Sequence, residues 1–200
     1  MKKALLVVDM QNDFIDQPGA ALAVPGAAAI ISRINSLAHS GEYDLVLACQ
    51  DWHPANHRSF YTEWAGKKPF DTVEMPYGTQ ALWPVHTVQG TWGAEFHAEI
   101  DQRPFRFIVR KGTNPGIDSY SAFFENDRTT PTGLGQLIAP DTQLDCCGVA
   151  TDFCLGASAL DAARFCRTVR VLLPAAAGIQ SESTAAMLDR LKEAGVTIAA

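Results

Sequence analysis

Six apolar runs of strand length recur along the chain, and helical patterns separate several of them. The runs span residues 4–8, 45–49, 105–109, 144–150, 169–173 and 196–199, and the helical patterns span 26–39, 154–166 and 182–194. Continuous apolar runs are typical of parallel strands buried on both faces, and alternation with helices is typical of βαβ units. The pattern predicts an α/β protein with a doubly wound, three-layer fold, in which a parallel sheet lies between helices.

Residues 51–104 interrupt this alternation. The segment is rich in Trp, Pro, Gly and His and has no clear apolar period. Long irregular insertions in a compact domain are usually functional. The length of 200 residues is within the range of one domain. We therefore expect a single domain over residues 1–200, with a functional insertion around 51–104.

Composition and charge exclude several classes of protein. The formal net charge of −6 gives no attraction to nucleic acid or anionic lipid, and no apolar run reaches the ~18 residues of a membrane span. Four of the five cysteines lie in or beside apolar runs, which is typical of free thiols in a reducing compartment. We expect a cytoplasmic protein that binds neither nucleic acid nor membrane.

Reactive side chains follow the first four predicted strands. Asp9 follows the first, Asp51 and His53 the second, Lys111 the third and Cys154 the fourth. Ligands of open α/β sheets bind beyond the carboxyl ends of the strands. These residues are therefore expected to share one edge of the sheet.

Cys154 is a candidate nucleophile at the start of a predicted helix. A helix N-terminus or a nearby cation can lower the pKa of a thiol from ~8.5 toward neutrality. The preceding turn can aim the backbone amides of Ala150 and Cys154 at a developing oxyanion. The alternative interpretation is a cysteine that only packs in the core.

Asp9 and Lys111 form a candidate catalytic unit with Cys154. Asp9 ends a buried strand, where desolvation can raise the pKa of its carboxyl enough for proton transfer. A positive charge on Lys111 would hold this carboxylate and favour the thiolate. Taken singly, Asp9 could be a turn residue or a helix N-cap, and Lys111 a solvated charge.

Asp51, His53 and His86 are candidate ligands of one divalent metal ion, and His57 is a candidate fourth ligand. Two imidazoles and a carboxylate suit Zn²⁺, Fe²⁺ or Mn²⁺, and the sequence does not choose among them. The same donor set describes non-haem Fe²⁺ oxygenases, which remain an alternative. The other histidines, His39 and His97, are interpreted as structural.

Six ordered motifs together carry a resemblance to a known family. They are "VVDMQNDF", "DWHPANHRSF", "WPVHTVQGTWGAEFH", "VRKG", "SAF" and "GVATDFCL". In this order they resemble the nicotinamidase (pyrazinamidase) family of isochorismatase-like cysteine hydrolases. The resemblance extends from residue 5 to about residue 166.

The resemblance implies a six-stranded parallel sheet and the hydrolysis of nicotinamide, and of pyrazinamide, to the acid and ammonia. The reaction would pass through a cysteine thioester and serve NAD salvage. The family's catalytic residues match Asp9, Lys111 and Cys154, and a cis peptide bond would join Val149 to Ala150. The family's metal ligands match the four residues named above, and the ion would hold the pyridine nitrogen. Aromatic residues of the substrate pocket match Phe14, Trp83 and Tyr120.

One departure and several alternatives remain at this stage. After the fifth strand the resemblance predicts an acidic residue, but the chain has Pro174 and Ala175, which puts local structure or subunit contacts in doubt. A metal-free amidohydrolase of carbamoyl or ureido compounds and a non-catalytic binding domain are the further alternatives. The expected partner is a small molecule, nicotinamide, and a homo-oligomer is left open.

Overall fold

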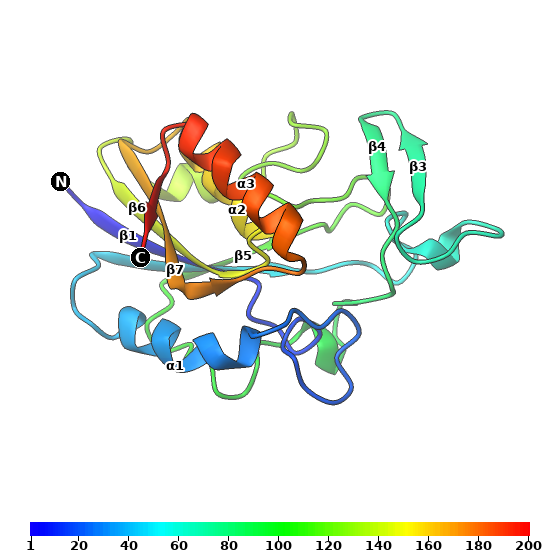
Figure 1. Cartoon of the computed structure of the whole chain (residues 1–200), viewed down its shortest axis with the longest axis horizontal. Helices are drawn as coiled ribbons and strands as arrows, with labels where there is room; N and C mark the ends of the chain where they lie inside the picture. Colours follow the sequence, from blue (N-terminus) through cyan, green and yellow to red (C-terminus); the bar gives the residue numbers. More distant parts are fainter.

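A parallel sheet of six strands forms the centre of the computed structural model, which describes residues 1–200 (Figure 1). The strands lie in the order β5-β2-β1-β6-β7-β8, and every neighbouring pair is parallel. The predicted three-layer α/β fold is confirmed. The bounds are β1 (Lys3–Val8), β2 (Leu45–Asp51), β5 (Phe107–Lys111), β6 (Gln143–Val149), β7 (Thr168–Ala177) and β8 (Thr197–Ala199).

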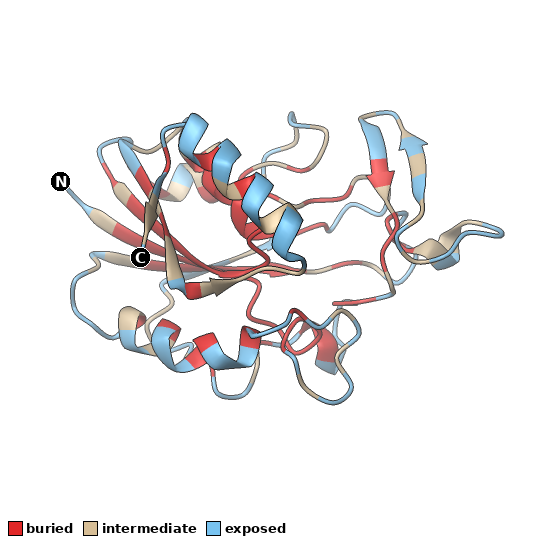
Figure 2. Cartoon of the chain, in the orientation of Figure 1, coloured by how far each residue is buried: buried red, intermediate tan, exposed pale blue.

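Helices cover both faces of this sheet. α1 (Ala27–Ala38) lies on one face, and α2 (Cys154–Ala162) and α3 (Ser181–Glu193) lie on the other (Figure 1). Figure 2 shows that the buried residues concentrate in the strands and on the helix sides that face them. The helix predicted over 154–166 ends earlier, and Phe165 beyond it stacks on Phe123. None of the helices has both the length and the apolar content that a membrane span requires.

The insertion between β2 and β5 contains a small antiparallel hairpin that the apolar pattern does not predict. Its strands are β3 (Thr72–Met75) and β4 (Gly78–Ala81), and it projects beyond the main sheet (Figure 1). Most of its residues are exposed or half-buried, so no apolar alternation marks it. Gln80 is the buried exception, and its side-chain amide donates to Asp118 at 2.6 Å. Short 3₁₀ turns cover Tyr61–Glu63, Trp92–Ala94 and Leu134–Leu137.

Pro174 lies inside β7, where an irregular register accommodates it. Cys146 pairs with Val171, but Gly148, two residues on, pairs with Ala176. The extra β7 residues form a bulge, and a bulge tolerates proline because its backbone groups do not all join the ladder. The departure from the family pattern at this position therefore corresponds to a bulged strand.

Candidate active site

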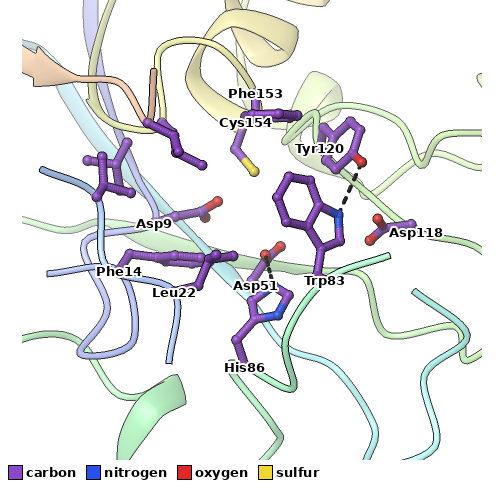
Figure 3. Close-up of a pocket in the computed structure, with 14 residues that line it drawn as sticks. Asp9, Phe14, Leu22, Asp51, Trp83, His86, Asp118, Tyr120, Phe153 and Cys154 are labelled. Carbon is purple, nitrogen blue, oxygen red and sulfur yellow. Dashed lines mark hydrogen bonds and ion pairs between the residues drawn. The ribbon is translucent and has the colours of Figure 1, made fainter. Parts of the chain in front are cut away.

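The carboxyl ends of β1, β2, β5 and β6 meet at one edge of the sheet and bring the predicted residues together. Asp9 follows β1, Asp51 ends β2, Lys111 ends β5 and Cys154 is the first residue of α2, directly after β6 and its turn. The chain winds outward in opposite directions from β1 and β6, so this edge is the switch point of the sheet. Figure 3 shows Asp9, Asp51 and Cys154 around a common cavity.

Lys111 is the centre of this cluster. Its side chain is fully buried, and its Nζ lies 2.9 Å from Asp9 Oδ2 and 3.4 Å from Cys154 Sγ. The ammonium also donates to Asp51 Oδ1 and, at 3.0 Å, to the Ser119 carbonyl oxygen. A buried ammonium with four polar partners is not the solvated strand-end charge of the alternative interpretation.

The two carboxylates keep Lys111 charged in a desolvated place. Burial alone would lower the pKa of Lys111, but Asp51 and Asp9 outweigh it and raise that pKa well above its usual value. For Asp9, burial is the largest influence and raises the pKa of the carboxyl, although Lys111 opposes it. Burial acts on Asp51 too, but Lys111 and His53 outweigh it and hold the pKa of this carboxyl well below its usual value. Asp9 is therefore the better proton acceptor of the two.

The thiol of Cys154 does not follow the expectation of a lowered pKa. Burial raises its pKa well above the usual value, and the opposing effect of Lys111 is smaller. The thiol therefore holds its proton and needs a base. Asp9 Oδ2 is suited to that task because its 2.9 Å ion pair with Lys111 is not aligned as a hydrogen bond, which leaves this buried oxygen without a hydrogen-bond donor.

In the turn between β6 and α2, the backbone amides of Ala150 and Cys154 donate no hydrogen bond. The peptide bond between Val149 and Ala150 is cis. Among the hydrogen bonds outside the regular elements, none is donated by the amides of Ala150 or Cys154, whereas Thr151 donates to Ala177 at 2.8 Å. Amides without an acceptor beside a candidate nucleophile can donate hydrogen bonds to a developing oxyanion and so form an oxyanion hole.

Asp51, His53 and His86 form a buried group of potential metal ligands. Their ligand atoms lie within 4.8 Å of one another, with the two Nε2 atoms 3.5 and 3.7 Å from Asp51 Oδ2. The outer Nδ1 atoms lie 2.9 Å from the Gly112 carbonyl oxygen and 2.7 Å from that of Pro84. Carbonyl oxygens only accept, so each Nδ1 carries a hydrogen, and each Nε2 is the ring atom that remains available to a metal ion. This donor set fits a divalent cation.

His57 is adjacent to this group, but both of its ring nitrogens have other partners. Its Nδ1 lies 2.7 Å from Ser59 Oγ and its Nε2 3.2 Å from the Ile117 carbonyl oxygen. Burial, reinforced by His53, lowers the pKa of His57 to about 4, so the ring is neutral near pH 7. Binding a metal through Nε2 would require the ring to release Ile117.

Glycine at position 112 lets the candidate metal ligand His53 pack against the end of β5. Gly112 has a φ of +65°, and a Cβ there would lie 2.4 Å from His53 Cε1. Gln11 supports Asp51, another candidate ligand, since its side chain donates to the Asp51 carbonyl oxygen and accepts from the Asp51 amide, both at 2.8 Å. The ligands are therefore oriented by contacts beyond the group itself.

The cavity beside Cys154 is mainly apolar: ten of its 14 lining residues are hydrophobic. Phe14, Trp83 and Tyr120 all line it, as the family resemblance implies (Figure 3). The Trp83 indole donates to the Tyr120 hydroxyl at 3.2 Å, and its ring meets Phe153 edge to face at 4.9 Å. Such a slot suits a flat aromatic ring.

Asp118 and Phe153 line the same cavity, and sequence reasoning missed both. Phe153 directly precedes the candidate nucleophile, a position that could have marked it as a pocket residue. Asp118 stands two residues before Tyr120, but one acidic residue in a loop carries no specific signal. Only its burial and its hydrogen bond from Gln80 distinguish it.

Comparison with known proteins places the chain among hydrolases. Residues 3–200 match the isochorismatase domain. The nicotinamidase of Acinetobacter baylyi is 49% identical over 164 residues, which cover 80% of this chain and 74% of that protein. The nicotinamidase of Escherichia coli is 37% identical over 98% of this chain and 93% of that protein.

Solved structures give the same result. A nicotinamidase/pyrazinamidase of Acinetobacter baumanii superposes with a TM-score of 0.91 at 43% identity, over 99% of this chain and 95% of that one. PnC1 of L. infantum in complex with nicotinate has a TM-score of 0.84 at 35% identity, over 98% of this chain and 91% of that one. A Pyrococcus horikoshii pyrazinamidase in complex with zinc has a TM-score of 0.76 at 33% identity, over 99% of this chain and 98% of that one. The chain belongs to the isochorismatase family, within its nicotinamidase and pyrazinamidase branch.

Proposed function

We propose that this protein is an amidohydrolase that converts nicotinamide to nicotinate and ammonia, and that it also hydrolyses pyrazinamide. The observation that carries the proposal is the contact of Lys111 Nζ with Asp9 Oδ2 and Cys154 Sγ beside an apolar cavity lined by aromatic side chains. The names of the relatives and the nicotinate in the L. infantum structure point to the same substrate class. An oxygenase would leave the contact of these three residues without a use.

The first half-reaction forms a thioester. Asp9 Oδ2 accepts the proton of the Cys154 thiol as Sγ attacks the amide carbon. Lys111 stabilises the negative charge that passes from the carboxylate to sulfur. The free amides of Ala150 and Cys154 donate to the oxyanion of the tetrahedral intermediate, and one such donor is typically worth about 3–4 kcal/mol. Asp9 then returns the proton to the leaving nitrogen, and ammonia departs.

The second half-reaction releases the acid. Asp9, again unprotonated, accepts a proton from a water molecule that attacks the thioester carbonyl. The same two amides hold the second tetrahedral oxyanion. Its collapse expels the Cys154 sulfur, which recovers a proton from Asp9, and nicotinic acid leaves and ionises to nicotinate in solvent. One carboxylate thus serves both halves, and no external acid or base is needed.

The cavity walls orient the substrate ring. Phe14, Trp83 and Tyr120 would contact its faces and edges, and fixing the ring against the nucleophile can remove several kcal/mol of barrier. Asp51, His53 and His86 would hold a divalent metal ion, with His57 as a further candidate ligand. When bound, that ion would supply a Lewis-acidic centre for the pyridine nitrogen. The zinc in the P. horikoshii structure supports zinc over iron or manganese.

The biological setting follows from the same chemistry. We propose that the whole chain acts as one domain, that its nicotinate product feeds NAD salvage, and that it works in the cytoplasm. All five cysteines are free, which suits a reducing compartment. The acidic net charge supports a small-molecule partner over nucleic acid.

Ammonia release from a panel of aromatic carboxamides tests the proposal. Nicotinamide and pyrazinamide should be hydrolysed, and benzamide should be hydrolysed much more slowly because it lacks the ring nitrogen. A chelator should reduce this difference in rate between nicotinamide and benzamide. A carbamoyl or ureido compound should not react. Hydrolysis of the carbamoyl compound in preference to nicotinamide would contradict the proposed substrate.

A further inference from the structure

A second cysteine contacts the carboxylate that the proposed mechanism uses as its base. The Sγ atom of Cys49 lies 3.1 Å from Asp9 Oδ1, and both residues are buried. Cys49 stands on β2, and its carbonyl oxygen also accepts from the Asp9 amide at 3.2 Å. An ionised carboxylate only accepts hydrogen bonds, so the thiol is the donor. Cys49 therefore holds Asp9 through backbone and side chain.

The two oxygens of Asp9 have different surroundings. Oδ1 is engaged by Cys49, whereas Oδ2 faces Lys111 and has no aligned hydrogen-bond donor. The backbone of Asp9 is already constrained, because its φ of 51° is in the left-handed region. Rotation of the carboxyl group is the freedom that remains. A donor on Oδ1 restrains this rotation and keeps Oδ2 toward the nucleophile.

Cys49 is placed so that it does not compete with Cys154. Its side chain is fully buried and is not among the residues that line the cavity. It therefore cannot reach a substrate, and any effect on catalysis must pass through Asp9. We propose that Cys49 is a positioning residue whose S–H orients Asp9 so that Oδ2 accepts the Cys154 proton. This inference rests on the proposed function, in which Asp9 is the base.

Three substitutions at this position separate hydrogen bonding from packing. Cys49→Ser keeps a donor, Cys49→Ala removes donor and volume, and Cys49→Val removes the donor but fills the space. Loss of a hydrogen bond to a charged group typically corresponds to a fall of about 10- to 100-fold in the reaction rate, where the bond supports the reacting group. We expect Ala and Val to lower kcat for nicotinamide by this factor with KM unchanged. The serine variant should stay within about threefold of wild type.

Cys146 supplies the matched control. It is a fully buried strand cysteine in the same core cluster, and its thiol makes no hydrogen bond. Cys146→Val should leave kcat unchanged, with a shift in melting temperature similar to that of Cys49→Val. Wild-type kcat in both Cys49→Ala and Cys49→Val would overturn the proposal. So would a serine variant that loses as much kcat as the alanine variant, because packing alone would then explain the effect.

A substrate-free measurement keeps this inference distinct from the proposed function. The rate of Cys154 alkylation by iodoacetamide at one fixed pH, followed by mass spectrometry of the Cys154 peptide, reports how readily its proton is removed. It should fall in the Ala and Val variants and be retained in the Ser variant. If wild-type protein releases no ammonia from nicotinamide, the proposed function fails, and alkylation still decides the role of Cys49. Equal alkylation rates in all variants would overturn that role.

Discussion

Removing the charge of Lys111 should abolish turnover while the fold survives. Lys111→Met keeps most of the side-chain volume and deletes an ammonium that lies 2.9 Å from Asp9 Oδ2 and 3.4 Å from Cys154 Sγ. At 3.4 Å, and with an effective dielectric constant of about 20, one ammonium–thiolate interaction is worth about 5 kcal/mol. That figure corresponds to a loss of about 10³- to 10⁴-fold in rate. We expect kcat/KM to fall by at least about 10³-fold.

The same change should also reduce stability. Deleting one partner of a buried ion pair typically costs about 3–5 kcal/mol, because the remaining charge is left without compensation. Here Asp9 can take up a proton, since burial already raises the pKa of its carboxyl. The loss of stability in Lys111→Met should therefore be smaller at pH 5 than at pH 8.

The assay combines ammonia release, thermal unfolding and metal analysis. Lys192→Met is the matched control, because Lys192 forms only an exposed ion pair with Asp189. Its kcat/KM and melting temperature should match wild type. Metal content should be retained in Lys111→Met, because the Asp51 carboxylate and both histidines remain. Wild-type rates of thioester formation in Lys111→Met would refute the assigned role of the charge.

Three further predictions concern the nucleophile, the metal ligands and a buried acid. Cys154→Ala should form no thioester with nicotinamide yet keep its metal, as intact-mass spectrometry and metal analysis can check; an acyl adduct in this variant would exclude Cys154 as nucleophile. His86→Ala should lose bound metal and most turnover, whereas His97→Ala should lose neither, and equal metal content in the two variants would contradict the ligand assignment. Burial and then Asp127 raise the pKa of Glu125 from 4.5 to about 7, so its ionisation weakens the folded state as the pH rises through that range. Glu125→Gln should therefore increase the free energy of unfolding at pH 8 by at most about 3 kcal/mol, which raises the melting temperature at that pH. At pH 4 the melting temperature should not change. The opposite pH trend would show that the carboxyl is ionised without penalty.

The order of apolar runs along the chain is sufficient to predict the fold. Each of the six runs is a strand of the main sheet. The central strands β1, β2 and β6 are buried almost throughout, and a strand buried on both faces must be apolar. The edge strands β5 and β8 are apolar as well, although most of their residues are exposed or half-buried. The first and last residues of the strands were predicted less well: the run at 105–109 corresponds to β5 at Phe107–Lys111. The β3–β4 hairpin was missed because its side chains are mostly exposed and its anchor, Gln80, bonds to a residue 38 positions away.

Residue types at strand ends also predicted which side chains meet. Parallel strands end at one edge of the sheet, so Asp9, Asp51, Lys111 and Cys154 converge whatever the intervening loops do. The roles assigned to these residues, and to the metal ligands, remain predictions that the experiments above address. The sequence thus determined the identity of the cluster through strand geometry alone.

Only the tertiary structure decided the electrostatics of the cluster. A helix N-terminus and a nearby lysine suggested a lowered pKa for the Cys154 thiol, yet burial outweighs the effect of Lys111 and raises that pKa. The orientation of Asp9 by Cys49, 40 residues away, was equally absent from the local pattern. Burial and hydrogen-bond partners depend on which distant segments surround a side chain, and no local sequence pattern encodes them. The elements follow from periodicity, but the chemical state of each group follows from its neighbours in space.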